Sequence, residues 1–168
     1  GALLAYIELT QKGNLPRLRT LQPVTGAGYM EINPATRRSL EITRTLSGDR
    51  KGSLLAAIDQ TITAGGARLL AQRIGAPLAD AAAINRRLDL VSWFAAAPDL
   101  SETLRASLKA IPDIDRALSR LSLGHGGPRD LDALARGMLA GSDLVVAVGK
   151  SQSGLATPEG LARLYESI

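Results

Sequence analysis

The sequence contains no cysteine and a single histidine among its 168 residues. Without cysteine there is no disulfide framework, no thiol nucleophile and no zinc finger, and one imidazole is too few for metal sites built on several histidines. Metal sites made only of carboxylates stay open. Aromatic residues are also scarce, with three tyrosines, one tryptophan and one phenylalanine. So few scattered rings cannot form the stacking platform that binds single-stranded nucleic acid.

Long apolar segments are missing as well. The longest uncharged apolar run, Leu144 to Gly149, is far shorter than the roughly 20 residues that a membrane helix needs. The first nine residues carry Glu8 and lack the cationic start of a signal peptide. We therefore expect no membrane contact and a cytoplasmic location, with which the absence of cysteine is compatible.

The charge of the chain is only mildly basic, with 20 Lys and Arg against 16 Asp and Glu and a net charge of +4. Such an excess favours nucleic acid only if the cations gather on one face. The arginines at 37–38 and 86–87 instead lie among acids such as Glu41 and Asp89, which is typical of solvated helix faces. With 45% apolar residues, the chain is predicted to form one ordinary packed domain.

The sequence predicts a mainly α fold with a small β-hairpin near the N-terminus. Leu18–Val24 and Tyr29–Ile32 are the two expected strands, and they flank the turn Thr25–Gly28. Proline, glycine and capping residues elsewhere punctuate helical patterns. The expected helices cover residues 2–12, 34–43, 53–61, 64–74, 80–95, 98–111, 113–121 and 128–148, with one more beginning at Thr157.

Three of the expected helices carry a regular apolar stripe, which predicts the face that each one buries. The stripes are Ile84, Leu88, Val91 and Ala95; Leu100, Leu104, Leu108 and Ile111; and Leu131, Leu134, Met138, Gly141, Val145 and Val148. Asp99 and Glu102 also resemble a capping box. Gly137 and Gly141 weaken the last helix, which indicates either a closely approaching neighbour helix or a local kink.

No catalytic centre is predicted from the residues. Gly149-Lys150-Ser151 resembles the end of a phosphate-binding loop, but the first glycine of that motif would fall at Leu144. The preceding apolar run also fits the long helix, so a helix C-terminus is the better interpretation. His125 lies between glycines with no partner acid or nucleophile in evidence.

Two pairs of acids, Asp113 with Asp115 and Asp130 with Asp132, are spaced at i and i+2. On a helix this spacing places the two carboxylates on different sides, so they cannot share a ligand. We expect them to cap helices or to lie favourably near the positive helix N-terminus.

Several ordered motifs together resemble the core domain of the MutS family of DNA mismatch-repair ATPases. Their order and intervals match over about residues 30–140. The motifs are Ala35–Ile42, Leu46–Gly48, Ser53–Leu55, Ile58–Thr61, Thr63–Leu70, Pro77-Leu78, Ile84–Val91, Asp113–Leu118, Arg120-Leu121 and Pro128–Leu131.

The resemblance implies that the chain is a piece of a longer protein. Residues 1–25 would be the end of the connector region and the start of the core, and residues 26–168 the core, or lever, domain, cut before or at the clamp insertion. This domain would be non-catalytic and would couple the DNA-gripping clamp to the C-terminal ATPase. No cofactor is expected here, whereas the parent would use ATP and Mg²⁺. Its implied partners are mismatched duplex DNA held by other domains, a second subunit and a MutL-type protein.

The same motifs suggest which residues hold helices or domains together. They have no catalytic partner nearby, although each is equally well explained as an ordinary exposed charge or cap. These residues are Arg37, Arg38, Glu41, Gly66, Arg68, Arg129 and Asp130. Two other functions stay open: a free-standing helical module that binds DNA or protein, and an NTPase that uses residues 149–151.

Overall fold

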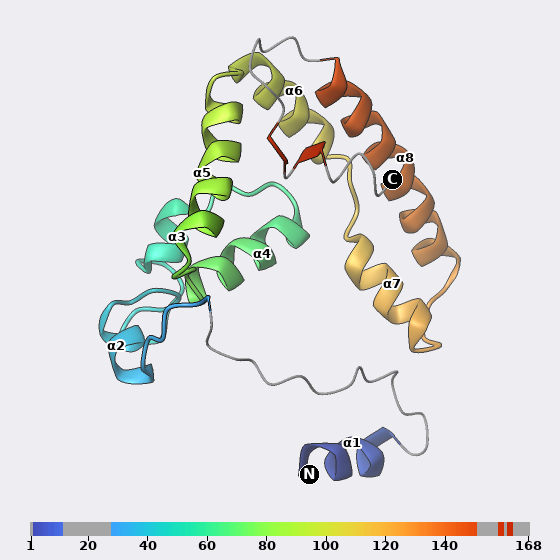
Figure 1. The fold of residues 1–168 in the computed structure, drawn as a ribbon. Coiled ribbons are helices and arrows are strands. Elements are labelled where there is room, and N and C mark those ends of the chain that lie inside the picture. The colour runs from blue at the N-terminus through green and yellow to red at the C-terminus, as the bar shows by residue number, and fades with distance from the viewer. Residues whose placement is uncertain (1, 12–27, 151–157, 160, 163–168) are drawn as a thin grey trace.

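The computed structural model describes residues 2–11, 28–150, 158–159 and 161–162, and within them the regular secondary structure is helical. The mainly α prediction is therefore confirmed (Figure 1). The helices are α1 (Ala2–Gln11), α2 (Pro34–Ser39), α3 (Leu54–Ile58), α4 (Ala64–Gly75), α5 (Ala81–Ala95), α6 (Pro98–Leu108), α7 (Ile114–Ser122) and α8 (Pro128–Gly149). None of these helices is long and apolar enough to cross a bilayer.

Side chains that precede the helices fix where most of them begin. A side-chain oxygen accepts a backbone N–H of the first turn, which satisfies a donor that the helix itself cannot use. The capping residues are Asn33 for α2, Ser53 for α3, Thr63 for α4, Asp80 for α5 and Asp113 for α7. The caps predicted at Asn33, Asp80 and Asp113 are thus confirmed.

The predicted β-hairpin is not supported. Its first strand, Leu18–Val24, lies outside the described residues. Its second strand forms a single antiparallel bridge between Tyr29 and Leu78, in which Met30 donates to the carbonyl of Pro77 at 2.8 Å. Residues 29–30 therefore pair with the segment that follows α4, a partner that local sequence could not indicate.

Several helices end earlier than expected: α3 ends at Ile58 instead of residue 61, and α6 at Leu108 instead of residue 111. Helix α2 stops at Ser39 instead of reaching residue 43, because Glu41 takes a positive φ of 47° that no helix can contain. Helix α6 begins at Pro98 with Ala97 as its N-cap, so the capping box expected at Asp99 and Glu102 is wrong. Proline at the first helical position needs no donor there and sets the start instead.

The closely packed helix pairs divide the helices into two groups. Close packing joins α3 with α4 in one group, and α5 with α6, α6 with α8 and α7 with α8 in the other. We call residues 28–79 the N-terminal helix group and residues 80–150 the C-terminal helix group. Each group has buried residues of its own: Ser53, Leu55 and Ile42 in the first, and Trp93, Leu104 and Ala117 in the second.

Only one of the three apolar stripes is buried as predicted. In α6, Leu104 is buried, and Leu100 and Leu108 are partly covered. In α5, Leu88 and Val91 are 54% and 63% exposed, and the buried residue is Trp93, whose ring packs edge-to-face on Phe94.

The stripe predicted for α8 is covered only in part: Leu134, Gly141, Val145 and Val148 are half-buried, but the two members that lie beside α7 are not. Leu131 and Met138 are 59% and 73% exposed, whereas Asp130 and Gly137 are buried. Helix α8 therefore meets α7 through Asp130 and Gly137, each of which precedes a residue of the predicted stripe. Periodicity predicted the helix correctly, but not the residues through which it meets α7.

Candidate functional site: polar and close contacts between the helices

Arg68 joins α4 to the start of α7. Its guanidinium holds Asp113 with both nitrogens, Nη1 to Oδ2 at 2.9 Å and Nη2 to Oδ1 at 2.8 Å, and Nη2 also reaches Oδ2 of Asp115 at 3.0 Å. Two parallel bonds to one carboxylate fix orientation as well as distance. This arrangement links the two helix groups through one side chain.

The two carboxylates that Arg68 holds were expected to lie on different sides of a helix, and that expectation is wrong. Asp113 is the N-cap of α7 and has non-helical backbone angles, so the helical spacing rule does not apply between it and Asp115. The capping function is still present, because Asp113 also accepts the N–H of Arg116 at 3.3 Å.

The Arg68 contact changes the titration of its partner. The hydrogen bonds from Arg68 are the largest cause that lowers the pKa of Asp113 from 3.8 to about 2, and they raise the pKa of Arg68 above its ordinary range. The Arg68 side chain is nevertheless 51% exposed and that of Asp113 23%. Water and salt therefore screen the attraction, and its contribution to stability is modest.

A second arginine also reaches from one helix group to the other. Arg105 in α6 donates from Nη1 to the carbonyl of Gln60, which lies between α3 and α4, at 3.1 Å. No sequence motif singled out this residue.

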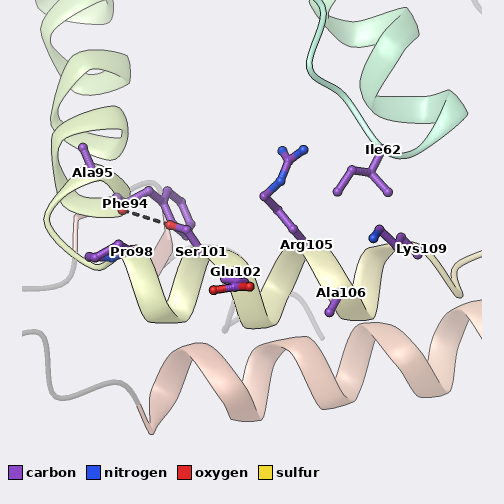
Figure 2. A pocket seen from close by; sticks show the side chains of 9 residues that line it. All are labelled: Ile62, Phe94, Ala95, Pro98, Ser101, Glu102, Arg105, Ala106 and Lys109. Atoms are coloured by element: carbon purple, nitrogen blue, oxygen red, sulfur yellow. Dashed lines mark hydrogen bonds between the residues drawn. The ribbon is translucent and has the colours of Figure 1, made fainter.

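Arg105 stands in an open cleft of about 610 Å³. Figure 2 shows its side chain rising from α6 toward the segment that carries Ile62, with Lys109 beside it and Phe94 at the far end. Ser101 donates to the carbonyl of Phe94 at 2.9 Å and fixes the corner between α5 and α6.

The carboxylate of Asp130 is buried at the start of α8 and accepts two hydrogen bonds. It accepts the N–H of Gly127, the N-cap residue, at 2.9 Å and Nη2 of Arg120 in α7 at 3.0 Å. One carboxylate thus caps α8 and joins it to α7. The turn before it needs glycine at 126, because a Cβ there would overlap Leu121.

The two glycines of α8 have different surroundings. Gly137 is buried against Ile114 of α7, where an added Cβ would overlap the isoleucine side chain, whereas Gly141 has nothing within 4 Å of that position. Helix α8 continues from Pro128 to Gly149 through both glycines. Close approach of a neighbour helix, one of the two interpretations of these glycines, therefore holds at Gly137 alone.

The remaining candidates make more local contacts or none. Arg37 donates to the carbonyl of Gly75 and so ties α2 to the end of α4. Gly66 gives its N–H to the Thr63 cap at 3.0 Å, and Oε1 of Glu41 accepts the N–H of Leu46 at 2.6 Å within the loop after α2. The side chains of Arg38 and Arg129 are exposed and make no hydrogen bond with other described residues.

The structure brings no chemical centre together among the described residues. Leu144 to Gly149 lies in α8 and Lys150 is its C-cap, as the helical interpretation predicts, while Ser151 lies outside the described residues. The described side chains contain no group of three or more His, Asp or Glu residues that could hold a metal ion. The arrangement is one of contacts between rigid elements.

Comparison with known proteins decides the family. Residues 35–168 match the family model described as MutS domain III. The chain belongs to the MutS family. This confirms the resemblance carried by the sequence motifs and supports a domain of a DNA mismatch-repair protein.

Individual MutS proteins are similar over nearly the whole chain. "DNA mismatch repair protein MutS" of Caulobacter sp. (strain K31) is 53% identical over 158 residues, 94% of this chain and 18% of that protein. The MutS protein of Rhodopseudomonas palustris (strain HaA2) is 56% identical over 140 residues, 83% of this chain and 15% of that protein. The chain therefore spans less than a fifth of the length of these relatives.

Proposed function

We propose that this chain is the lever part of a MutS-type mismatch-repair protein and that it couples the DNA-gripping clamp to the C-terminal ATPase. In this proposal the chain itself is non-catalytic. ATP and Mg²⁺ act in the ATPase of the parent, mismatched duplex DNA is held by its other domains, and the parent works in the cytoplasm with a second subunit and a MutL-type partner.

The observation that carries the proposal is the double attachment of α8 to α7. Asp130 binds Arg120 at 3.0 Å, and two helical turns further along Gly137 lies directly against Ile114. With 22 residues and ~1.5 Å rise per residue, α8 is a rod of ~33 Å. A rod attached at two points of a neighbouring helix moves with it as one body, which is what a lever requires.

The connection at Arg68 would carry that motion onward. Arg68 links the start of α7 to α4, and Arg37 links the end of α4 to α2, so polar contacts follow one another across the domain. Coupling through a protein needs such elements to shift between discrete arrangements, and contacts alone do not supply it. The lever role therefore needs a functional test.

The test uses the full-length parent with Arg68→Gln and Arg129→Ala introduced separately. We expect Arg68→Gln to keep mismatch binding without ATP and to slow ATP-dependent release from the mismatch several-fold. The Arg129 side chain is exposed and forms no hydrogen bond with the described residues. An effect of Arg129→Ala on release would therefore indicate that this residue contacts another domain. Arg136→Gln, which breaks an ion pair inside α8, is the control. Unchanged release in both variants would contradict the lever role.

A further inference from the structure

Among the described residues, two arginines form the side-chain hydrogen bonds that join the two helix groups. Each group has its own buried residues and its own closely packed helix pairs, and the chain passes from one to the other at Ala79 and Asp80. Arg68 crosses from α4 to Asp113 and Asp115, and Arg105 crosses back from α6 to Gln60. In the N-terminal group the crossings end on α4 and on the segment between α3 and α4; in the C-terminal group they end at α7 and on α6.

An open cleft separates the groups beside one of these crossings. One lining residue, Ile62, comes from the N-terminal group, and the others, among them Phe94 and Lys109, come from the C-terminal group. At about 610 Å³ the open cleft has room for many water molecules. The Arg105 side chain spans this space instead of apolar packing (Figure 2).

The chemistry of the Arg68 contact suits a connection that opens and closes. Two carboxylates meet one guanidinium with good geometry, which defines a single closed arrangement. The side chains of Arg68, Asp113 and Asp115 are partly exposed, so water can solvate their charges when they separate. No buried charge is then left without a partner.

We propose that the two helix groups turn relative to each other about residues 79–80. In the closed arrangement Arg68 holds the groups together through Asp113 and Asp115, and we call this contact the latch. The bond from Arg105 to Gln60 would be a second contact that holds the closed arrangement. The inference rests on the lever role and deepens it, since the latch would decide whether the α7–α8 rod moves with α4. Salt is the natural means of weakening the latch, because exposed ion pairs are screened.

The absence of cysteine makes a direct distance measurement possible. Cysteines placed at the exposed positions Gln72 in α4 and Ser122 in α7 would carry spin labels for pulsed electron resonance. We expect one narrow distance distribution in the otherwise unchanged chain at low salt. With Arg68→Gln, the distribution should broaden and shift to longer distance. Raising salt to about 1 M, where the Debye length is ~3 Å, should shift the unchanged chain toward the variant and leave the variant as it is.

Matched variants separate the latch from a general loss of structure. Arg136→Gln breaks the Arg136–Asp132 pair of 2.7 Å inside α8 and should leave the distances unchanged. Asp115→Asn removes the outer carboxylate without touching the Asp113 cap, and should give a distribution between the other two. Far-UV circular dichroism must show the same helix content for each variant. If Arg68→Gln lowers the helix content, the distances in Asp115→Asn and in the salt series decide whether the latch exists.

The outcomes also distinguish the latch from the lever role. Unchanged distances in Arg68→Gln and Asp115→Asn, together with no salt response, would overturn the latch even if Arg68→Gln slows release in the parent. Altered distances in the chain, together with normal ATP-dependent release in both Arg68→Gln and Arg129→Ala of the parent, would support the latch and contradict the lever role.

Discussion

Gly137 in α8 lies so close to Ile114 in α7 that a methyl group added to the glycine would overlap the isoleucine side chain. Glycine inside a helix costs about 1 kcal/mol relative to alanine, so it is retained here at an energetic disadvantage. The close approach of the two helices is the structural reason for it. Gly141, one turn further along, has no such neighbour.

The two glycines should respond in opposite ways to alanine. Gly137→Ala gains ~1 kcal/mol of helix propensity, but overpacking costs roughly 1–3 kcal/mol, so we expect a net loss of stability of up to ~2 kcal/mol. Gly141→Ala should raise the free energy of unfolding by up to ~1 kcal/mol. Urea unfolding followed by circular dichroism measures both. The added methyl should cost less in an Ile114→Ala background, and an equal cost there would contradict the assigned contact.

A second prediction concerns the buried carboxylate at the start of α8. Asp130→Ala removes the acceptor of the Gly127 N–H and leaves Arg120 without its partner, so the free energy of unfolding should fall by about 1–2 kcal/mol. The control is Asp132→Ala, which removes an exposed acid paired with Arg136 and should cost at most about 0.5 kcal/mol. Similar losses in both variants would contradict the assigned role of Asp130 as the cap of α8 and the partner of Arg120.

The lowered pKa of Asp113 predicts how stability depends on pH. Because the folded state holds this pKa at about 2, below the ordinary 3.8, the carboxylate stabilises the fold fully above about pH 4 and loses this contribution as the pH falls toward 2. In Arg68→Gln the largest cause of the shift is gone, so that variant should lose less stability over the same interval. Thermal unfolding of both proteins at about pH 4 and pH 2 measures the difference. Equal losses would mean that Arg68 does not hold Asp113 in solution.

Helix positions could be predicted from the sequence because their signals are local. Asn33, Asp80 and Asp113 cap the helices that follow them through bonds to residues two or three positions along. Such contacts need no knowledge of the remaining fold. The pairing of Tyr29 with Leu78 depends on how α4 returns the chain, so the predicted hairpin failed.

The buried faces and the contacts of the site depend on distant residues. Leu131 and Met138 of the predicted α8 stripe are exposed, because the preceding residue of each, Asp130 and Gly137, is the one that meets α7. Arg68 could be selected from its motif, but its partners were misjudged because Asp113 lies just outside the helix that contains Asp115. The contact of Arg105 could not be predicted from the sequence, because its acceptor is a backbone carbonyl, which every residue has.

The last prediction concerns duplex DNA and the chain by itself. A free-standing DNA-binding module would need unpaired cations gathered on one face, yet Arg50, Arg68, Arg120 and Arg136 each bind a carboxylate within the chain. Cations already neutralised in this way release few counterions from DNA, so affinity should be low and its salt dependence shallow. We expect the 168-residue chain to bind a fluorescent duplex no more tightly than the ~100 μM to ~1 μM range of non-specific binding at physiological salt. Fluorescence anisotropy over a salt series measures this, and sub-micromolar binding with a steep salt slope would favour the module over the lever.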